Sequence, residues 1–293
     1  MLYLIQFPDI SPELFSIDLF GFTLALRWYA LAYIAGILLG WRYIVVLINR
    51  PQLWGTPPMT ARQVEDLMTW MVIGIILGGR IGFALFYNYT YYSQNPVEIL
   101  QVWKGGMSFH GGMLGVVIAT ILFGWRNKLP MLSVGDAIAT AAPIGLLLGR
   151  LANFINGELW GRPTEVSWAM VFPDPRAQVC PDGWLAICAR HPSQLYEAAL
   201  EGAVLLLVMG FLIWRKGGLK APGRMIGVFL TGYGAARFFV EFYREPDAQF
   251  VSAANPLGHV IALGEYGITM GQTLSMPMII GGIIFLAYSK RKK

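Results

Sequence analysis

Residues 134–158 read VGDAIATAAPIGLLLGRLANFINGE, and this stretch indicates the class of protein. Its apolar part is long enough to cross a bilayer as a helix, for which about 20 residues suffice. Its end carries Arg150, Asn153, Asn156 and Glu158. Ionisable residues at membrane depth are usually functional, because a charge there costs at least about 2.5–3.5 kcal/mol. We therefore expect a membrane helix that ends in a functional site.

The composition extends this expectation to all 293 residues of the chain. Hydrophobic residues make up 56% and charged residues 13%, with a mean hydropathy of +0.54, which is too apolar for a soluble domain of this length. The apolar segments do not alternate as the strands of a β-barrel do. We predict an all-α polytopic membrane protein with seven transmembrane helices at Phe20–Trp41, Leu67–Tyr87, Met107–Trp125, Val134–Ile155, Leu195–Trp214, Met225–Phe242 and Met270–Tyr288.

The basic residues orient these helices, because cytoplasmic loops are enriched in lysine and arginine. One side holds thirteen of them: Arg42, Arg50, Arg62, Arg126, Lys128, Arg215, Lys216, Lys220, Arg224, Lys290, Arg291, Lys292 and Lys293. The opposite side holds six: Arg27, Lys104, Arg162, Arg176, Arg190 and Arg244. The N-terminus is then expected outside and the C-terminus in the cytoplasm. The net charge of +5 follows from this bias and indicates no nucleic-acid partner.

The chain is expected to form one membrane-embedded domain, residues 1–293, because we find no internal repeat, low-complexity tract or second soluble domain. Its long loops, 88–106, 157–194 and 244–269, all fall on the outer side, where we expect the working face. No cleavable signal peptide is expected. Segment Met1–Asp18 is too short to span and is predicted to lie along the surface, tethered by Phe7, Leu14 and Phe15.

Arg150 is the first candidate for binding a substrate. It shares a helix face with Asn153, three residues later. An arginine presents a planar fork of five donors that suits a phosphate. The alternative is a structural arginine that binds helix-end carbonyls or reaches the membrane interface.

Two further segments place charges within or near the spans. Arg237 and Glu241 are four residues apart and form either an intrahelical ion pair or part of a site. Glu197 and Glu201 are also four residues apart, and we expect them to meet an intramembrane arginine. Ser193 is expected to cap the helix that carries them.

Arg80 lies among glycines that allow close helix approach, and we expect it to pair with a carboxylate first and a phosphate second. Asp136 is expected to sit favourably at the start of its own helix. His110 opens a span and is either a proton acceptor or a histidine hydrogen-bonded at a helix start.

The two cysteines, Cys180 and Cys188, fall in an outer loop, where either a disulfide or two free thiols are possible. Ligands for a zinc site are too few. We expect no metal and no redox cofactor.

These motifs together resemble those of the bacterial prolipoprotein diacylglyceryl transferases, in the family's order. They are GRLANFINGELWG at 149–161, FHGG at 109–112, HPSQLYE at 191–197, the Tyr233, Arg237 and Glu241 helix, Gly271-Gln272, and Arg27-Trp28-Tyr29-Ala30. Many members carry histidine and glycine where this chain has Arg27 and Ala30. The likeness is weakest in Pro163–Ala189, so no family role is carried onto the cysteines.

The resemblance implies a multi-pass protein of the bacterial inner membrane, with a periplasmic N-terminus, a cytoplasmic C-terminus and a periplasmic loop region at about 157–194. It implies transfer of the diacylglyceryl group from phosphatidylglycerol to the lipobox cysteine of a prolipoprotein, with release of glycerol phosphate. The implied catalytic residues are Arg150, Arg237, His110, Tyr29 and Glu241. The implied substrate-binding residues are Arg150, Arg237, Asn153 and Gly161. To these we add Asn156, Glu158 and Arg80 as our own candidates.

Such a reaction needs a thiolate, a cation beside the phosphate and a lipid held in line. We expect Arg150 and Arg237 to clamp the phosphate, Asn153 and Asn156 to bind headgroup hydroxyls or backbone, and His110 to accept the thiol proton, with Tyr29 or Glu241 as alternatives. Two rival functions remain open: a transporter for an anionic lipid or metabolite, and a phosphatidylglycerol-binding scaffold without chemistry.

Overall fold

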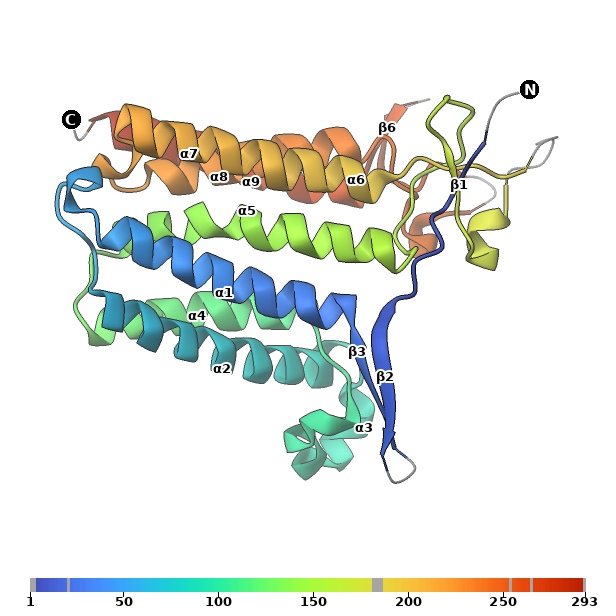
Figure 1. The fold of residues 1–293 in the computed structure, drawn as a ribbon, viewed down its shortest axis with the longest axis horizontal. Helices are drawn as coiled ribbons and strands as arrows, with labels where there is room; N and C mark the ends of the chain where they lie inside the picture. The colour runs from blue at the N-terminus through green and yellow to red at the C-terminus, as the bar shows by residue number, and fades with distance from the viewer. Residues whose placement is uncertain (1–3, 20–21, 181–186, 253–254, 264–265, 292–293) are drawn as a thin grey trace.

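The computed structural model describes residues 4–19, 22–180, 187–252, 255–263 and 266–291. In this part of the chain, six helices are long and apolar enough to cross a membrane: Trp28–Ile48, Ala61–Phe86, Phe109–Arg126, Met131–Ile155, Ser193–Lys216 and Met270–Lys290. They run side by side in a bundle, with the two termini toward opposite ends (Figure 1). The prediction of an all-α polytopic membrane protein is confirmed at this level.

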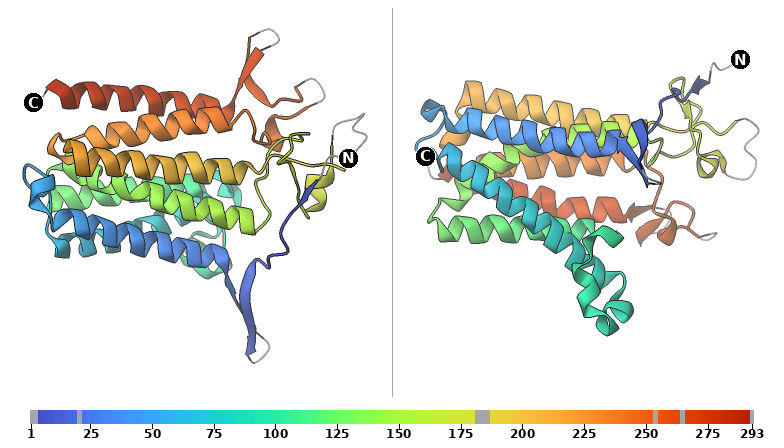
Figure 2. Two further views of the ribbon diagram at one scale, coloured as in Figure 1. Left: turned by 45° about the horizontal axis from the view of Figure 1, so that its top comes forward. Right: turned by 60° about the horizontal axis from the view of Figure 1, so that its bottom comes forward.

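Helix α5 (Met131–Ile155) lies in the middle of the bundle (Figure 1). It packs against α1 (Trp28–Ile48) on one side. On the other it packs against α8 (Arg224–Val240) and a continuous helical segment made of α6 (Ser193–Glu197), η5 (Ala198–Val204) and α7 (Leu205–Lys216). Helix α9 (Met270–Arg291) packs on α8 at the edge of the bundle (Figure 2). The end of α5 is therefore surrounded by three other helical segments.

Helices α2 (Ala61–Phe86) and α4 (Phe109–Arg126) form a close pair at the opposite edge. Gly74 and Gly78 of α2 face Gly111 and Gly115 of α4, and a Cβ on any of the four would collide with backbone of the facing helix. Small residues permit this backbone approach. The expectation that glycines near Arg80 bring helices together is confirmed.

The predicted start of the first span is wrong. Strands β2 (Glu13–Leu19) and β3 (Phe22–Arg27) form an antiparallel hairpin, and α1 begins only at Trp28. Phe20 itself lies outside the described residues. The segment Phe15-Ser16-Ile17-Asp18-Leu19 alternates apolar and polar side chains, a period that favours a strand over a helix.

The N-terminal segment is attached to the protein at two points. Strand β1 (Ile5–Gln6) pairs in parallel with β4 (Met170–Val171), and Phe7 packs on the rings of Phe154 and Phe172. Leu14 and Phe15, on β2, are about half exposed. Phe7 is thus an anchor onto the protein, while Leu14 and Phe15 face outward.

The remaining short elements lie in the connecting segments. They are η1 (Pro51–Leu53), α3 (Tyr89–Gln94), η2 (Pro96–Leu100), η3 (Val102–Lys104), η4 (Pro175–Gln178), η6 (Gly218–Lys220), η7 (Ala248–Phe250), β5 (His259–Leu263) and β6 (Tyr266–Thr269). Strands β5 and β6 form a second antiparallel hairpin directly before α9. The described parts of the long segments 88–106, 157–192 and 244–269 all gather at the end of the bundle where α5 ends and α6 begins (Figure 2).

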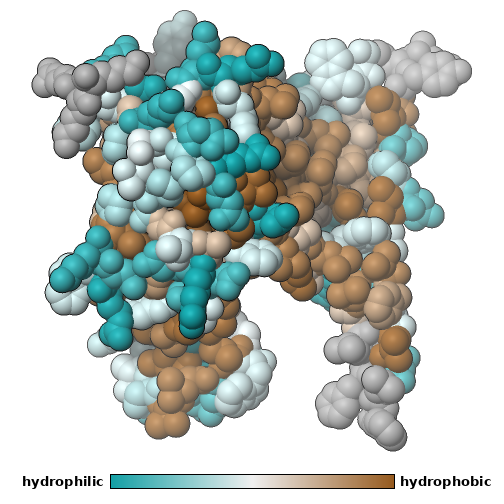
Figure 3. Space-filling model, turned by 60° about the vertical axis from the view of Figure 1, so that its left-hand side comes forward, coloured by the Kyte–Doolittle hydropathy of each residue, from teal (hydrophilic) through white to brown (hydrophobic). Residues whose placement is uncertain are grey.

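The outer faces of the bundle are apolar. Large exposed hydrophobic side chains lie on α1, α2, α4 and α9, including Leu38, Ile73, Ile121 and Ile284. Figure 3 looks toward the end that holds the C-terminus, where hydrophilic side chains gather, while hydrophobic side chains cover the flanks. An apolar flank of this extent fits lipid rather than water.

Candidate functional site

Six charged side chains converge beside the end of α5, and we call them the charge cluster: Arg150, Glu197, Glu201, Arg237, Glu241 and Arg244. Arg150 binds two carboxylates, with Nη1 at 3.3 Å from Glu197 Oε2 and Nη2 at 3.4 Å from Glu201 Oε2. The expectation that Glu197 and Glu201 meet an intramembrane arginine is confirmed.

Arg237 shares Glu197 with Arg150. Its Nη1 donates to Glu197 Oε1 at 2.5 Å, and its Nη2 lies 2.8 Å from Glu241 Oε2. The i,i+4 pair of Arg237 and Glu241 is therefore present, but it belongs to a larger network. One carboxylate, Glu197, joins the arginines of two different helices.

Arg244 completes the charge cluster from the turn after α8. Its Nε lies 3.5 Å from Glu197 Oε1, and its Nη1 lies 3.4 Å from Glu241 Oε2. The sequence reasoning placed Arg244 in a loop and did not consider it for a site. Its position three residues after Glu241 is the signal that could have identified it, since residues at i and i+3 share a helix face.

Residues at the start of α9 contact the charge cluster at Glu241. Thr269 Oγ1 donates to Glu241 Oε1 at 3.1 Å, and the backbone N–H of Thr269 donates to Gln272 Oε1 at 3.1 Å. A Cβ on Gly271 would lie 2.5 Å from the carboxyl carbon of Glu241. Gly271 is therefore glycine because the Glu241 carboxylate occupies the space that a side chain would need.

Glu197 and Glu201, the two carboxylates of the fifth predicted span, are positioned by a π-helical turn. η5 follows Glu197 directly and contains Glu201. Such wider turns occur mostly inside α-helices and often at functional sites. Both glutamates are 0% exposed.

Burial separates the two kinds of charge in the cluster. The side chains of Arg150, Arg237 and Arg244 are 20%, 15% and 13% exposed, whereas those of Glu197, Glu201 and Glu241 are 0%, 0% and 6% exposed. The carboxylates are thus more deeply buried than the guanidinium groups that they bind, and the guanidinium groups stay partly exposed. Such an arrangement suits an anion that enters a poorly hydrated pocket.

A second group of polar side chains, which we call the amide cluster, lies one turn further along α5: Tyr29, Asn153, Asn156 and Glu158. Glu158 Oε1 accepts from Asn153 Nδ2 at 2.9 Å and from Asn156 Nδ2 at 3.3 Å. The Tyr29 hydroxyl contacts Tyr33 at 3.2 Å and interacts with Asn153. The structure thus brings four of the predicted site residues together.

The turn that presents Glu158 has an unusual backbone. Gly157 and Leu159 both have positive φ, at 64° and 58°. Gln194 Nε2 donates to the Glu158 carbonyl at 2.6 Å, and Ser193 Oγ donates to the Leu159 carbonyl at 3.1 Å. The prediction that Ser193 caps its helix is wrong, because its hydroxyl holds this turn instead.

A cavity with a volume of about 360 Å³ opens beside the amide cluster. It is lined by Asn156 and by the base of the β2–β3 hairpin: Ser11, Pro12, Glu13 and Arg27. Arg27 Nη2 lies 3.3 Å from Glu13 Oε1, and the two side chains are 66% and 36% exposed. Arg27 is therefore a surface ion-pair partner near the site.

Gly161 lies where three segments meet. Its N–H donates to the His191 carbonyl at 2.8 Å, and a Cβ at this position would collide with the Tyr243 carbonyl and with His191. Burial lowers the pKa of His191, whose Nδ1 lies 3.1 Å from the Tyr196 hydroxyl. The space at Gly161 lets the loop after α5 pass between the starts of two other segments.

Arg80 differs from the expectation. Its guanidinium is buried and binds backbone carbonyls of one outer loop, those of Glu98, Ile99, Gly105 and Gly106. It also lies over the ring of Tyr92. The expected carboxylate partner is replaced by carbonyl groups, because the loop from 98 to 106 folds over the end of α2.

Asp136 also acts differently from the expectation. Its carboxylate accepts from the N–H groups of Gly223 at 2.7 Å and Ile226 at 2.9 Å. It therefore caps the start of α8 and not of its own helix. The same attraction between a carboxylate and a helix N-terminus operates, but between two helices.

His110 is not part of either cluster. It lies on the exposed first turn of α4, with its ring 5.7 Å from that of Phe109. Within the described residues it takes no part in the hydrogen bonds and ion pairs that join Arg150 and Arg237 to their carboxylates. α4 begins at the same end of the bundle as the clusters (Figure 1).

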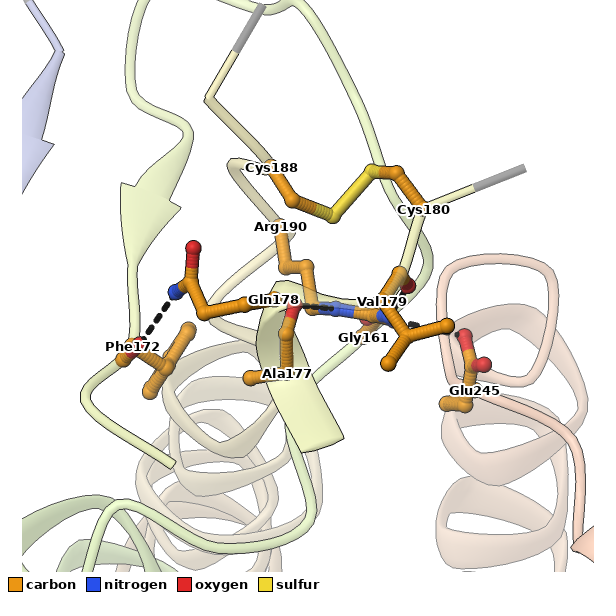
Figure 4. The surroundings of a disulfide bond; sticks show 9 residues. All are labelled: Gly161, Phe172, Ala177, Gln178, Val179, Cys180, Cys188, Arg190 and Glu245. Atoms are coloured by element: carbon orange, nitrogen blue, oxygen red, sulfur yellow. Dashed lines mark hydrogen bonds and ion pairs between the residues drawn. A yellow bond between two sulfur atoms is a disulfide. The ribbon is translucent and has the colours of Figure 1, made fainter. Parts of the chain in front are cut away.

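The cysteines are bonded to each other. Cys180 and Cys188 form a disulfide with an S–S distance of 2.07 Å and a Cα–Cα distance of 5.7 Å (Figure 4). In the described ranges, no group of three or more His, Cys, Asp or Glu side chains could hold a metal ion. The three glutamates of the charge cluster are instead paired with arginines.

Known proteins resemble this chain over nearly its whole length. The sequence model of a family described as prolipoprotein diacylglyceryl transferase matches residues 15–288. A protein of Ruegeria pomeroyi named phosphatidylglycerol–prolipoprotein diacylglyceryl transferase is 60% identical over 284 residues, which cover 96% of each chain. Proteins of the same name from Cereibacter sphaeroides, at 58% identity over 98% of each chain, and from Rhizobium meliloti, at 48% identity over 99% of this chain and 95% of the relative, are also similar.

Proposed function

The chain belongs to the prolipoprotein diacylglyceryl transferase family, and we propose that its charge cluster is the centre of the family's reaction. The enzyme transfers the diacylglyceryl group of phosphatidylglycerol to a prolipoprotein, the first step of lipoprotein maturation. The observation that carries our assignment of the site is the shared carboxylate of Glu197, which holds Arg150 and Arg237 at 3.3 Å and 2.5 Å.

In the proposed mechanism, Arg150 and Arg237 bind the phosphate of phosphatidylglycerol. The sulfur of the lipobox cysteine attacks the glyceryl carbon that bears the phosphate ester. A C–S bond forms, the C–O bond breaks, and its electron pair stays on the phosphate oxygen of the departing glycerol phosphate. The phosphate gains negative charge as the bond breaks, so two fixed arginines stabilise the transition state more than the bound lipid.

The carboxylates give the arginines their position. Glu197 and Glu201 are buried on the inner side of Arg150, and Glu241 is buried beside Arg237. A guanidinium so fixed does not need to reorganise when the phosphate charge develops. The partial exposure of the arginines supports this role, because the open N–H donors remain available to a substrate.

We propose that the amide cluster holds the glycerol headgroup or the nearby backbone of a substrate. Asn153 and Asn156 both donate to Glu158, which leaves their amide oxygens to accept from hydroxyl groups. The buried Asn156 Oδ1 has no hydrogen-bond partner among the described residues. Gly161 and Arg80 would then act indirectly, Gly161 by leaving space for the loop after α5 and Arg80 by binding carbonyls of the loop at 98–106.

His110 is our candidate for the group that accepts the thiol proton. An imidazole can act as a general base toward a thiol. The position of His110 on the exposed first turn of α4 supports access from the outer end of the bundle. Tyr29 and Glu241 are alternatives, but Glu241 is already engaged by two arginines and Thr269.

We further propose seven spans, with a periplasmic N-terminus, a cytoplasmic C-terminus and residence in the bacterial inner membrane. α8, with 17 residues, packs between α5 and α9 and is the candidate for the additional span. The chain would be one domain, residues 1–293, with its loop region at about 157–194 in the periplasm. The disulfide supports that side, because disulfides persist in oxidising compartments.

The experiment that tests the function uses purified protein in lipid nanodiscs. Phosphatidylglycerol and a synthetic lipobox peptide are added, and the peptide is weighed by mass spectrometry. We expect a diacylglyceryl adduct on the cysteine, and a peptide with serine in its place should remain unmodified. The proposal would be contradicted if the folded protein yields no adduct even when the lipid or the peptide is supplied in excess.

A further inference from the structure

Arg190 is a buried arginine that the proposed reaction does not use. It is 2% exposed and lies directly before His191, at the end of the loop that precedes α6. Figure 4 shows its side chain pointing into the space between that loop and Glu245. A cation this deeply buried is stable only when its donors are satisfied.

The guanidinium of Arg190 binds three separate segments. Nε donates to the Ala177 carbonyl at 2.6 Å, and Nη2 donates to the Val179 carbonyl at 2.6 Å. Nη1 donates to the Gly161 carbonyl at 3.2 Å and to Glu245 Oε2 at 2.9 Å. Arg190 therefore joins two stretches of the loop between α5 and α6, at Gly161 and at 177–179, to the segment that follows α8.

The disulfide holds two of these acceptors against Arg190. Cys180 directly follows Val179, and Cys188 is two residues before Arg190. The bond therefore links the segment that carries the carbonyl acceptors to the segment that carries Arg190 (Figure 4). Without it, the segment from Ala177 to Val179 would be held to Arg190 only by hydrogen bonds and loop packing.

The contacts of Arg190 continue to the charge cluster. Gly161, one of its acceptors, pairs with Arg244 in an antiparallel bridge. Arg162 donates from its backbone to the Tyr243 carbonyl at 2.8 Å and from Nε to the Arg244 carbonyl at 2.9 Å. The backbone of Arg244 is therefore fixed by the same loop that Arg190 holds.

Arg244 in turn contacts the carboxylates that hold Arg237. Its side chain reaches Glu197 at 3.5 Å and Glu241 at 3.4 Å, and both glutamates bind Arg237. A shift of Arg244 would move these carboxylates. Small displacements of groups that support a reacting centre change rates and affinities strongly.

We propose that Arg190 is a positioning residue for Arg244, and that the Cys180–Cys188 disulfide keeps the carbonyl acceptors of Arg190 in place. This inference rests on the proposed role of the charge cluster in binding the phosphate. Opening the disulfide loosens the contacts of Arg190, releases the backbone of Arg244 and weakens the grip of Arg237 on a phosphate. Binding of phosphatidylglycerol and of glycerol phosphate then weakens, while binding of the peptide does not.

The test opens the disulfide reversibly in the folded wild-type protein. A water-soluble phosphine converts the disulfide to two thiols and becomes the phosphine oxide, with the oxygen supplied by water; the reagent is removed before the assay. We expect the KM for phosphatidylglycerol in mixed nanodiscs to rise about tenfold. The inhibition constant of glycerol phosphate should rise in parallel, with an unchanged KM for the peptide. Reoxidation with oxidised glutathione, which accepts the two electrons, should restore both values.

Two sets of variants separate positioning from loss of folding. The double variant Cys180→Ala/Cys188→Ala should behave like the reduced wild type and should not respond to the phosphine. Arg190→Lys keeps the charge but loses the fork, so it should raise the same KM without reduction. Arg176→Lys, in the same loop, is the matched control and should leave all values unchanged, because its side chain is 80% exposed.

The outcomes distinguish this inference from the proposed function. An oxidised wild-type protein without transferase activity contradicts the function. Equal KM values for the active oxidised and reduced proteins overturn the inference alone. If the variants give less folded protein but that protein keeps the wild-type KM and inhibition constant, Arg190 has a purely structural role. This result would also overturn the inference.

Discussion

Arg150 and Arg237 lie on apolar helices and are held by carboxylates that are more deeply buried than the arginines themselves. A lone arginine there would be costly, and a neutral pair would gain little over apolar residues. The network instead keeps each guanidinium charged, fixed and partly open. We therefore propose that the network serves function and not stability.

The first prediction concerns the guanidinium of Arg150. Arg150→Lys keeps a positive charge but cannot bind Glu197, Glu201 and a phosphate together, since an ammonium lacks the planar fork. We expect the transfer rate to fall by about 10²–10³-fold, the usual cost of losing one donor to a developing anion. Mass-spectrometric transfer assays on folded protein check this. Arg176→Lys is the control, and an Arg150→Lys variant with the wild-type rate would remove Arg150 from the phosphate site.

The second prediction concerns His110. His110→Gln retains size and polarity but cannot take up a proton, so we expect a fall of about 10²–10⁴-fold, typical of a lost general base. The dependence of the rate on pH should change with it. Rates measured from pH 5.5 to 9 check this, and an unchanged profile would transfer the role to Tyr29 or Glu241.

The third prediction concerns His191, whose pKa is lowered by burial. The unfolded chain then binds a proton more readily than the folded protein, so this residue favours unfolding as pH falls below about 6.5. We expect the apparent melting temperature in detergent to fall between pH 7.5 and 5. The fall should be smaller for His191→Asn, and equal falls in both proteins would show that other groups cause it.

At the scale of elements, helix geometry decides which side chains can meet. The π-helical η5 carries Glu201 next to Glu197, and the glycines of α2 and α4 allow their backbones to touch. Neither the π-helical turn nor the glycine contact takes a direct part in the reaction. Both determine where the chemical groups lie, because helix ends and loops follow the packing of the helices beneath them.

The fourth prediction tests the contact between α2 and α4. A Cβ at Gly78 would collide with the backbone of Gly111, so Gly78→Ala should lower the free energy of unfolding by about 1–3 kcal/mol, as overpacking does. Gly210→Ala, in α7, is the matched control. A Cβ there meets nothing within 4 Å, and the change should be neutral or stabilising. Equilibrium unfolding of both variants checks this, and equal stabilities would argue against the close pair.

At the scale of the whole molecule, the number of spans determines which side each terminus occupies. The structure contains six helices that meet the length and hydropathy of a span, within the described residues, and α8 is slightly shorter. With α8 crossing, the N- and C-termini lie on opposite sides. Without it, they lie on the same side.

The fifth prediction uses this difference in parity. A green fluorescent protein fused to the C-terminus should fluoresce, because it folds in the cytoplasm and not after export through the general secretory route. A periplasmic reporter enzyme fused at the N-terminus behind its own signal should be active in the same cells. A fluorescent C-terminal fusion together with an inactive N-terminal reporter would place both termini in the cytoplasm and leave α8 outside the set of spans.

Much of this architecture follows from periodicity and composition. Six of the seven predicted spans overlap helices of the structure, with ends that differ by at most six residues, since long apolar runs have few alternatives in a membrane. The first span was placed too early, because the alternating segment before Trp28 forms a hairpin. The sequence also identified Arg150, Arg237, Glu241 and the amide-cluster residues as individual candidates.

What the sequence by itself determined is the set of membrane helices, their charged positions and the family. Only the tertiary structure decided which charges share a site. Glu201 meets Arg150 across 51 residues of sequence and Glu197 meets Arg237 across 40, while Asp136 caps a different helix and Arg80 binds a loop. The physical reason is that a buried polar group takes its partner from whichever segment packs beside it. That neighbour is set by the arrangement of helices and not by distance along the chain.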